Sequence, residues 1–224
     1  MHVRILFLLI IASGLAPAVR AQKIEFGGGF GGMNYKGDIS PVFHPKFMKP
    51  GGHLFFRYNA TKAVSGRFSL TGGRIYGSDI KSSDPFQQKR GVIFGTRIIE
   101  ASADVQFNFL DFNYARRRPR NWSPYVFAGL GLFTFKPDQE KVEPYKTTGL
   151  AIPFGAGIKW QVKGPWSIGV EFGTRKTFTD YLDNYNAHGA GIPKNYQSDP
   201  TRKDMYYYSS ISVSYTILKI ACPD

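Results

Sequence analysis

The sequence predicts an all-β protein, an eight-stranded antiparallel transmembrane β-barrel. Three observations lead to this fold class: apolar and polar residues alternate with a period of two, the polar faces carry charges of both signs, and long connections alternate with short ones. Residues 99–109 (IEASADVQFNF) show the alternation most clearly, because Val105 and Phe107 fall on one face while Asp104 falls on the other. A period of two is typical of a β-strand with two different faces.

The first 21 residues have the pattern of a secretory signal peptide, which leaves residues 22–224 as one barrel domain. Arg4 precedes an apolar segment that runs from Ile5 to about Ala16, and the sequence Ala-Val-Arg-Ala closes it. This apolar segment is shorter than the roughly 20 residues that a membrane-spanning helix needs. No later apolar stretch is long enough either, so we expect any membrane association to use something other than helices.

Charge and cysteine content narrow the classes of partner. Loss of Arg4 and Arg20 with the signal peptide lowers the net charge from +13 to +11. A basic protein suits anionic partners such as lipid phosphate or acidic protein, and export argues against nucleic acid. The chain has one Cys, so an internal disulfide framework is excluded.

The eight strands are assigned in chain order. The first three are residues 23–35, 51–60 and 64–76; the fourth contains 99–109 and the fifth is 122–135. In 150–162 the residues Phe154, Ile158 and Trp160 oppose Lys159. In the seventh strand, around 166–175, apolar residues at even positions oppose Glu171 and Arg175 at odd positions. In the eighth, a run of apolar residues from Ile211 to Ile217 alternates with Ser and Thr.

A closed barrel in lipid explains why polar faces carry both charges and glycines. Apolar residues face the hydrocarbon, small residues and paired charges fill a narrow lumen, and closure satisfies every strand edge. Because an eight-stranded lumen holds only its own side chains and an unpaired buried charge costs several kcal/mol, we interpret the lumen charges as a structural network, not a channel or active site. The predicted network is Glu25, Arg57, Arg67, Glu100, Asp104, Lys159, Glu171 and Arg175.

Connection lengths predict a location and an orientation. The connections at 36–50, 77–92, 136–148 and 178–204 are long, those at Asn59–Ala63 and Lys163–Pro165 are short, and 110–121 is intermediate. Bacterial outer-membrane barrels have short periplasmic turns and long outward loops. We therefore expect an outer-membrane protein with its termini and short turns in the periplasm. Trp122, Trp160, Trp166 and Tyr206–Tyr208 lie near predicted strand ends, where aromatic side chains mark membrane interfaces.

The segment RKTFTDYLDNYN (175–186) ends the alternation of the seventh strand. Asp180 and Asp183 suit either a loop that folds back on the barrel rim through Asp and Tyr hydrogen bonds or an ion site. The loop offers the further oxygen and nitrogen ligands Asn184, Asn186, His188 and Asp199, without a recognisable ligand spacing. We favour the loop that folds back, which needs no cofactor.

An enzymatic interpretation has little support in the sequence. Some eight-stranded barrels act on lipid A through a Ser/His/acid arrangement at the outer rim. The histidines of the mature chain are His44 and His188 in outward loops and His53 near a strand start, without a companion Ser pattern. We therefore predict a protein that is not an enzyme and has no cofactor.

Four segments carry a resemblance to a known family. GGMNYKGDIS (31–40), SPYVFAGLGLFTFKP (123–137), IPFGAGIKW (152–160) and EFGTRKTFTDYLDNY (171–185) resemble the PorG-like barrels of the type IX secretion system of Bacteroidetes-type bacteria. The resemblance implies a non-enzymatic component that links the periplasmic ring of the lipoprotein PorK and its partner PorN to the outer membrane. The alternative is a general structural or adhesin-like small outer-membrane barrel.

Two periplasmic features are candidate contacts with such a ring. Cys222 follows the last strand, and an odd Cys in an oxidising compartment suggests an intermolecular disulfide or a reactive thiol; a thiol without a role is the alternative. The turn 113–121 concentrates arginines, which suit bidentate contact with carboxylates or with lipid phosphate, whereas solubility alone would also explain them. These arginines are Arg116, Arg117, Arg118 and Arg120.

Overall fold

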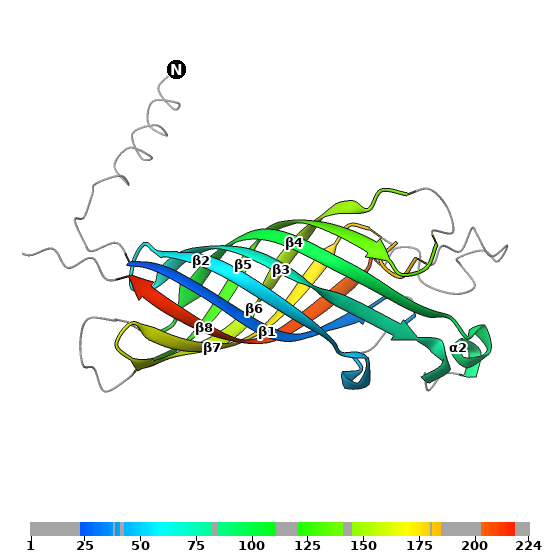
Figure 1. Ribbon diagram of the computed structural model, residues 1–224, viewed down its shortest axis with the longest axis horizontal. Coiled ribbons are helices and arrows are strands. Elements are labelled where there is room, and N and C mark those ends of the chain that lie inside the picture. Colours follow the sequence, from blue (N-terminus) through cyan, green and yellow to red (C-terminus); the bar gives the residue numbers. More distant parts are fainter. Residues whose placement is uncertain are drawn as a thin grey trace, which may run out of the picture.

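Eight antiparallel strands form a closed barrel in which the last strand pairs with the first (Figure 1). The computed structural model describes residues 23–37, 39–40, 43–81, 85–110, 121–140, 145–179, 181–184 and 203–217. The predicted fold class is confirmed. The strands are β1 (Lys23–Lys36), β2 (Lys49–Asn59), β3 (Val64–Ser78), β4 (Ile93–Asn108), β5 (Trp122–Pro137), β6 (Thr148–Lys163), β7 (Trp166–Thr177) and β8 (Met205–Ile217).

The outer wall of the barrel is apolar. Phe30, Leu54 and Leu130 have 74%, 68% and 67% of their surface exposed, and their sequence neighbours point inward. Inward positions on the same wall include the buried Ser102 and Gln106. This arrangement confirms the predicted outward apolar face, which is what a barrel in lipid requires.

The connection lengths follow the prediction in part: the β2–β3 and β6–β7 connections are short, but 109–121 between β4 and β5 is longer than 138–147 between β5 and β6. Between β6 and β7, Gly164 adopts a φ of 54°, which glycine accepts without strain, and its carbonyl accepts a hydrogen bond from the Gln161 side chain at 2.7 Å. Between β2 and β3, the Thr61 hydroxyl accepts a hydrogen bond from the Val64 amide at 2.8 Å. Figure 1 shows both turns at the end of the barrel where β1 begins and β8 ends. This end is called the short-turn end below.

The opposite end carries the long connections and is called the long-loop end. Within the described residues, its helical segments are η1 (Pro45–Phe47), η2 (Asp79–Lys81) and α2 (Pro85–Arg90). No helix in this part of the chain is long and apolar enough to cross a membrane.

The tryptophans lie on the outer wall near the short-turn end. Trp122 and Trp160 are register partners on β5 and β6, and the Trp166 ring meets the Tyr215 ring at 5.0 Å between centroids. This position agrees with the predicted interface belt. The prediction is wrong for Tyr206 and Tyr208, because both face the lumen and are 0% and 1% exposed.

Placing a charge on the outer wall should lower the free energy of unfolding by an amount that depends on how deep the residue lies in the membrane. Leu130→Arg, near the middle of β5, should destabilise the folded barrel by about 2–4 kcal/mol, because it places a cation in hydrocarbon. The matched Val162→Arg lies beside the β6–β7 turn at a position that is 61% exposed, and it should cost about 0–1 kcal/mol. Urea unfolding of the protein in phospholipid vesicles measures both values. Equal losses would contradict the assignment of the outer wall to lipid.

Candidate functional site

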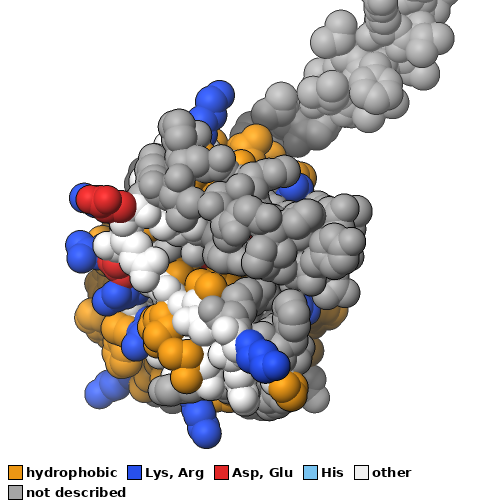
Figure 2. Space-filling model, turned by 90° about the vertical axis from the view of Figure 1, so that its right-hand side faces the viewer, with side chains coloured by type: hydrophobic (Ala, Val, Ile, Leu, Met, Phe, Trp, Pro, Cys, Tyr) orange, Lys and Arg blue, Asp and Glu red, His pale blue; other side chains and the backbone are white. Residues whose placement is uncertain are grey.

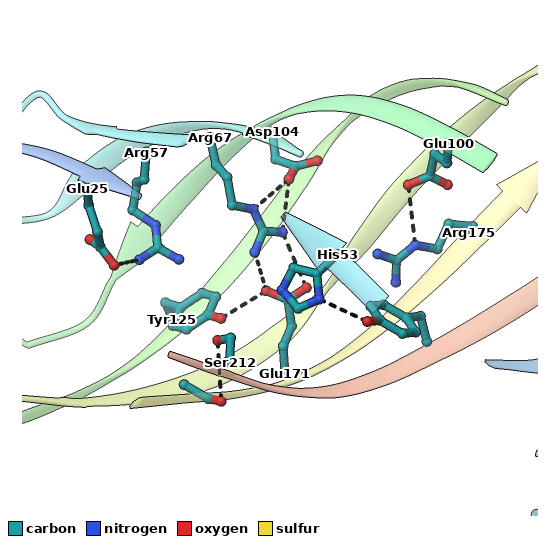
Figure 3. Close-up of polar contacts among 12 residues, drawn as sticks. Glu25, His53, Arg57, Arg67, Glu100, Asp104, Tyr125, Glu171, Arg175 and Ser212 are labelled. Carbon is teal, nitrogen blue, oxygen red and sulfur yellow. Dashed lines mark hydrogen bonds and ion pairs between the residues drawn. The ribbon is translucent and has the colours of Figure 1, made fainter. Parts of the chain in front are cut away.

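The centre of the lumen is organised around Arg67. Its Nε lies 2.9 Å from Asp104 Oδ2 on the neighbouring strand β4. Its two terminal nitrogens lie 2.5 Å and 3.3 Å from the carboxylate oxygens of Glu171 on β7, and the Tyr125 hydroxyl donates to the same carboxylate at 2.9 Å. Figure 3 shows Arg67 between the two acids. Because β3 and β7 are opposite each other in the ring of eight strands, this group spans the barrel.

Two further ion pairs lie on either side of the central group. Arg57 Nη1 lies 2.5 Å from Glu25 Oε1 toward the short-turn end. Arg175 Nε lies 3.7 Å from Glu100 Oε1, and Glu100 also accepts a hydrogen bond from the Tyr206 hydroxyl across the lumen. These two pairs and the Tyr206 hydrogen bond link β1 to β2, and β4 to both β7 and β8.

Aromatic rings cover the cations of the lumen. The guanidinium carbon of Arg67 lies 4.9 Å from the centre of the Phe127 ring, and that of Arg175 lies 5.2 Å from the centre of the Tyr208 ring. Lys159 Nζ lies 5.6 Å from the centre of the Tyr125 ring. A cation over an aromatic face is attracted by the ring quadrupole, most strongly where water is excluded.

The structure places all eight residues of the predicted lumen network inside the barrel. Their exposed fractions lie between 0% for Glu25 and 7% for Glu171. Seven of them take part in the ion pairs above, and Lys159 contacts the network through Tyr125. The arrangement can hold strands together, and its charged side chains are buried.

The long-loop half of the lumen is apolar, which differs from the expectation of small residues and paired charges throughout. Phe94, Ile98 and Phe133 point inward there. Apolar side chains fill this half because they need no hydrogen-bond partner when water is excluded. Ile39 and Leu182, from the loops after β1 and β7, are buried against them. The cluster is Met33, Tyr35, Ile39, Ile75, Phe94, Ile98, Phe133, Phe135, Ala151, Leu182, Tyr206 and Tyr208.

In the described part of the loop after β7, residues 181–184 fold back onto the rim, as predicted, and Asp183 is one of the anchors. The Tyr35 hydroxyl at the end of β1 lies 2.6 Å from Asp204 Oδ1 and 3.0 Å from Asp183 Oδ2, so it bridges the two carboxylates. The Leu182 amide donates to Asp204 Oδ2 at 3.0 Å, and the Thr96 hydroxyl donates to the Leu182 carbonyl at 2.6 Å. Leu182 therefore enters the lumen between two fixed backbone contacts. We call Tyr35, Thr96, Leu182, Asp183 and Asp204 the rim latch.

A second contact fastens the same loop to the connection after β5. The Tyr145 hydroxyl donates to Asn184 Oδ1 at 2.5 Å, and the Asn184 side chain donates to the Glu140 carbonyl at 2.9 Å. Burial, with Asp183 nearby, raises the pKa of Tyr145 to about 12, so its hydroxyl remains a donor well into the alkaline range. Asn184 has a φ of 54°, a conformation that Asn tolerates better than most residues.

The described histidines lie apart from each other, and the described residues form no metal site. His53 faces the lumen, where its Nδ1 lies 2.9 Å from the Tyr208 hydroxyl, and the His44 carbonyl accepts a hydrogen bond from the Asn34 side chain. Among the described residues, no group of three His, Cys, Asp or Glu is close enough together to hold a metal ion.

Several predicted residues lie outside the described part of the chain. They are the signal peptide (1–21), the turn residues Arg116, Arg117, Arg118 and Arg120, the loop residues Asp180, Asn186, His188 and Asp199, and Cys222.

The sequence interpretation missed the tyrosines that complete the network. Tyr35, Tyr125 and Tyr206 each donate to a buried carboxylate. Their positions were readable, because Tyr35 shares the odd positions of β1 with Glu25, and Tyr206 shares the even positions of β8 with inward Ser214.

Comparisons with known proteins agree with this architecture. A family described as "Domain of unknown function (DUF6089)" matches residues 3–223. The chain belongs to this family. No curated protein sequence matches the DUF6089 chain.

Solved structures similar to the DUF6089 chain include outer-membrane barrels. Neisserial surface protein A is 9% identical with a TM-score of 0.53, and the match covers 88% of this chain and 97% of that one. Ail, the attachment invasion locus protein of Yersinia pestis, is 12% identical with a TM-score of 0.51, covering 88% and 100%. At these identities the likeness shows the fold alone, which is that of eight-stranded outer-membrane barrels.

Removal of the central cation should destabilise the barrel strongly. Arg67→Met leaves Asp104 and Glu171 buried without their partner, which should cost about 3–5 kcal/mol. The control Arg97→Met removes an exposed cation 3.5 Å from Asp138, and its loss should be at most about 1 kcal/mol. Urea unfolding in an uncharged detergent compares the two. Arg67→Met that unfolds like the wild type would show that the lumen pairs do not hold the barrel together.

Loss of the Tyr35 hydroxyl should open the rim latch without unfolding the barrel. Tyr35→Phe leaves Asp183 and Asp204 without their bridge, and a lost buried hydrogen bond costs about 1–3 kcal/mol. Hydrogen exchange at the Leu182 amide should therefore become roughly tenfold faster or more, while β4 amides stay unchanged. The control Tyr207→Phe alters an outward ring that stacks on Phe172. If Tyr207→Phe accelerates exchange at the Leu182 amide as well, the Tyr35 hydroxyl is not what holds the loop in place.

Proposed function

We propose that this chain is a non-enzymatic outer-membrane component of a type IX secretion system, which links a periplasmic ring of PorK and PorN type to the outer membrane. The observation that carries the proposal is the filled lumen. A barrel filled by ion pairs at its centre and by an apolar cluster toward the long loops is suited to anchoring, because its interior side chains occupy the space that a solute would need.

The proposal also uses the resemblance in four segments to PorG-like barrels. The most specific of them, RKTFTDYLD (175–183), contributes Arg175 to the lumen network and Asp183 to the rim latch. The resemblance therefore falls on residues that organise this barrel, as well as on its repetitive wall.

The proposed orientation places the short-turn end in the periplasm. Short turns and termini of bacterial outer-membrane barrels face that compartment, and the tryptophan belt of Trp122, Trp160 and Trp166 would lie at the inner interface. Strands β4 and β8 end on this side (Figure 1). The arginine-rich segment 113–121 and Cys222 come after these strands in the sequence, so they are the proposed contacts with the ring.

Crosslinking in intact envelopes tests the proposal. A photoactivatable probe attached to the Cys222 thiol should capture a ring subunit of PorK or PorN type, because residues beyond β8 would reach the periplasmic ring. Mass spectrometry identifies the captured protein. The Cys222→Ser chain, treated in the same way, is the control for probe attached elsewhere.

A second arm replaces Arg116, Arg117, Arg118 and Arg120 by Glu. If the arginine turn docks an acidic patch of the ring, charge reversal should reduce the capture at low salt, where exposed charges are least screened. Capture of lipid or of abundant bystanders alone would reject the ring and favour a general structural or adhesin-like barrel. A wild-type chain that gives no thiol-sensitive band on non-reducing gels would reject the disulfide version of the contact.

A further inference from the structure

Three cations stand side by side on the outer wall near the long-loop end. Arg74 on β3 is the register partner of Arg97 on β4, and Arg97 is the register partner of Lys136 on β5. All three side chains are exposed on the outer face, with 48% exposure for the Arg74 side chain and 73% for that of Arg97. We call these three residues the cationic row. Like charges directly opposite each other on a sheet destabilise it, so an anion beside the row would stabilise it.

Asp138 supplies part of that negative charge. It pairs with Arg74 and lies 3.5 Å from Arg97 Nε, and its own amide donates to the Gly95 carbonyl at 2.8 Å. A side chain at Gly95 would collide with Asp138 Oδ2 and with Arg74 Nη2, so this glycine makes room for the pair. One carboxylate against three cations leaves a net charge of +2 at the row.

The row borders the apolar wall. The next large outward side chains toward the middle of the barrel are Leu70 on β3, Ile99 on β4 and Leu132 on β5, which are 50%, 57% and 66% exposed. Ile99 is two residues from Arg97, a separation of roughly 7 Å along a strand. Figure 2, which views the long-loop end, shows Lys and Arg side chains projecting at its left and lower edges with hydrophobic side chains between them. The row therefore lies at the edge of the apolar wall, where a membrane around this wall would have its head groups.

We propose that Arg74, Arg97 and Lys136 bind the phosphate of an anionic lipid of the outer leaflet, whose acyl chains lie on Leu70, Ile99 and Leu132. The guanidinium fork matches phosphate bidentately, and Lys136 adds a compact charge on the third strand. Asp138 contacts both arginines, so it fixes them beside each other on the outer side. The choice of leaflet rests on the orientation given under the proposed function; the phosphate chemistry does not.

The site is tested by measuring how strongly diphosphoryl lipid A binds the purified full-length barrel in an uncharged detergent. Native mass spectrometry is the readout. Arg97→Gln should weaken binding about tenfold, the value of one charge-assisted hydrogen bond to phosphate. The matched control is Lys176→Gln on β7, an exposed outward cation whose register partners are the uncharged Ile152 and Met205. It should change binding less than twofold.

Two comparisons decide the chemistry of the ligand. Dephosphorylated lipid A should bind wild type as weakly as diphosphoryl lipid A binds Arg97→Gln, and inorganic phosphate at millimolar concentration should not displace the lipid. Equal binding of the dephosphorylated lipid, displacement by free phosphate, or an equal effect of Lys176→Gln would each overturn the proposal. An unchanged melting temperature of Arg97→Gln in detergent without lipid confirms that the variant folds.

The leaflet is tested separately. A cysteine placed at Gln139, beside the row in the connection after β5, should react with a membrane-impermeant maleimide on intact cells of a Cys222→Ser strain. Lack of labelling, with labelling after the outer membrane is opened, would reject the orientation and the outer leaflet. Lipid binding by the purified barrel would then still stand, so failure of the ring linkage and failure of the phosphate site are distinguishable.

Discussion

The narrowness of an eight-stranded barrel is the constraint on which the rest of this structure depends. Side chains that point inward from opposite walls meet, so every inward charge needs a partner within reach. Arg67 is the clearest case, since it is held by Asp104 on the adjacent strand and by Glu171 on the opposite wall. Neither wall can shift along the barrel axis without separating a buried charge from its counter-ion, which costs several kcal/mol.

The lumen is divided into two chemically different halves. The ion pairs of Arg57 and Arg67 occupy the short-turn half and the centre, and the Arg175–Glu100 pair meets the apolar cluster at its tyrosines. The cluster fills the half below the long loops. Leu182 and Ile39 close the apolar half from above. The rim latch fixes Leu182 in place through Asp204 and Thr96, so polar contacts at the rim maintain an apolar contact inside it. Anchoring, the proposed role, needs this kind of filled interior and no passage.

The wall of the barrel was predictable from the sequence because it depends on local alternation. The placement of Glu171 and Arg175 inside and of Val170 and Phe172 outside follows from a period of two. The pairing inside was not predictable, because the choice of Asp104 and Glu171 as partners for Arg67 depends on the register of three strands. The interior place of Tyr206 and Tyr208 was misread, because an aromatic residue near a strand end suits either the interface belt or an apolar lumen. The contact of Tyr35 with Asp183 joins residues 148 positions apart, and no local pattern encodes such a distance.

The side chains that cross the lumen also have a mechanical consequence. Arg67 reaches from β3 to β7, and Tyr206 reaches from β8 to Glu100 on β4, so two diameters at different heights are braced by short polar contacts. An empty tube under the lateral pressure of a bilayer can flatten into an ellipse by rotating its strands. Here, flattening along either diameter must compress or break a buried contact, so we expect these two contacts to resist it.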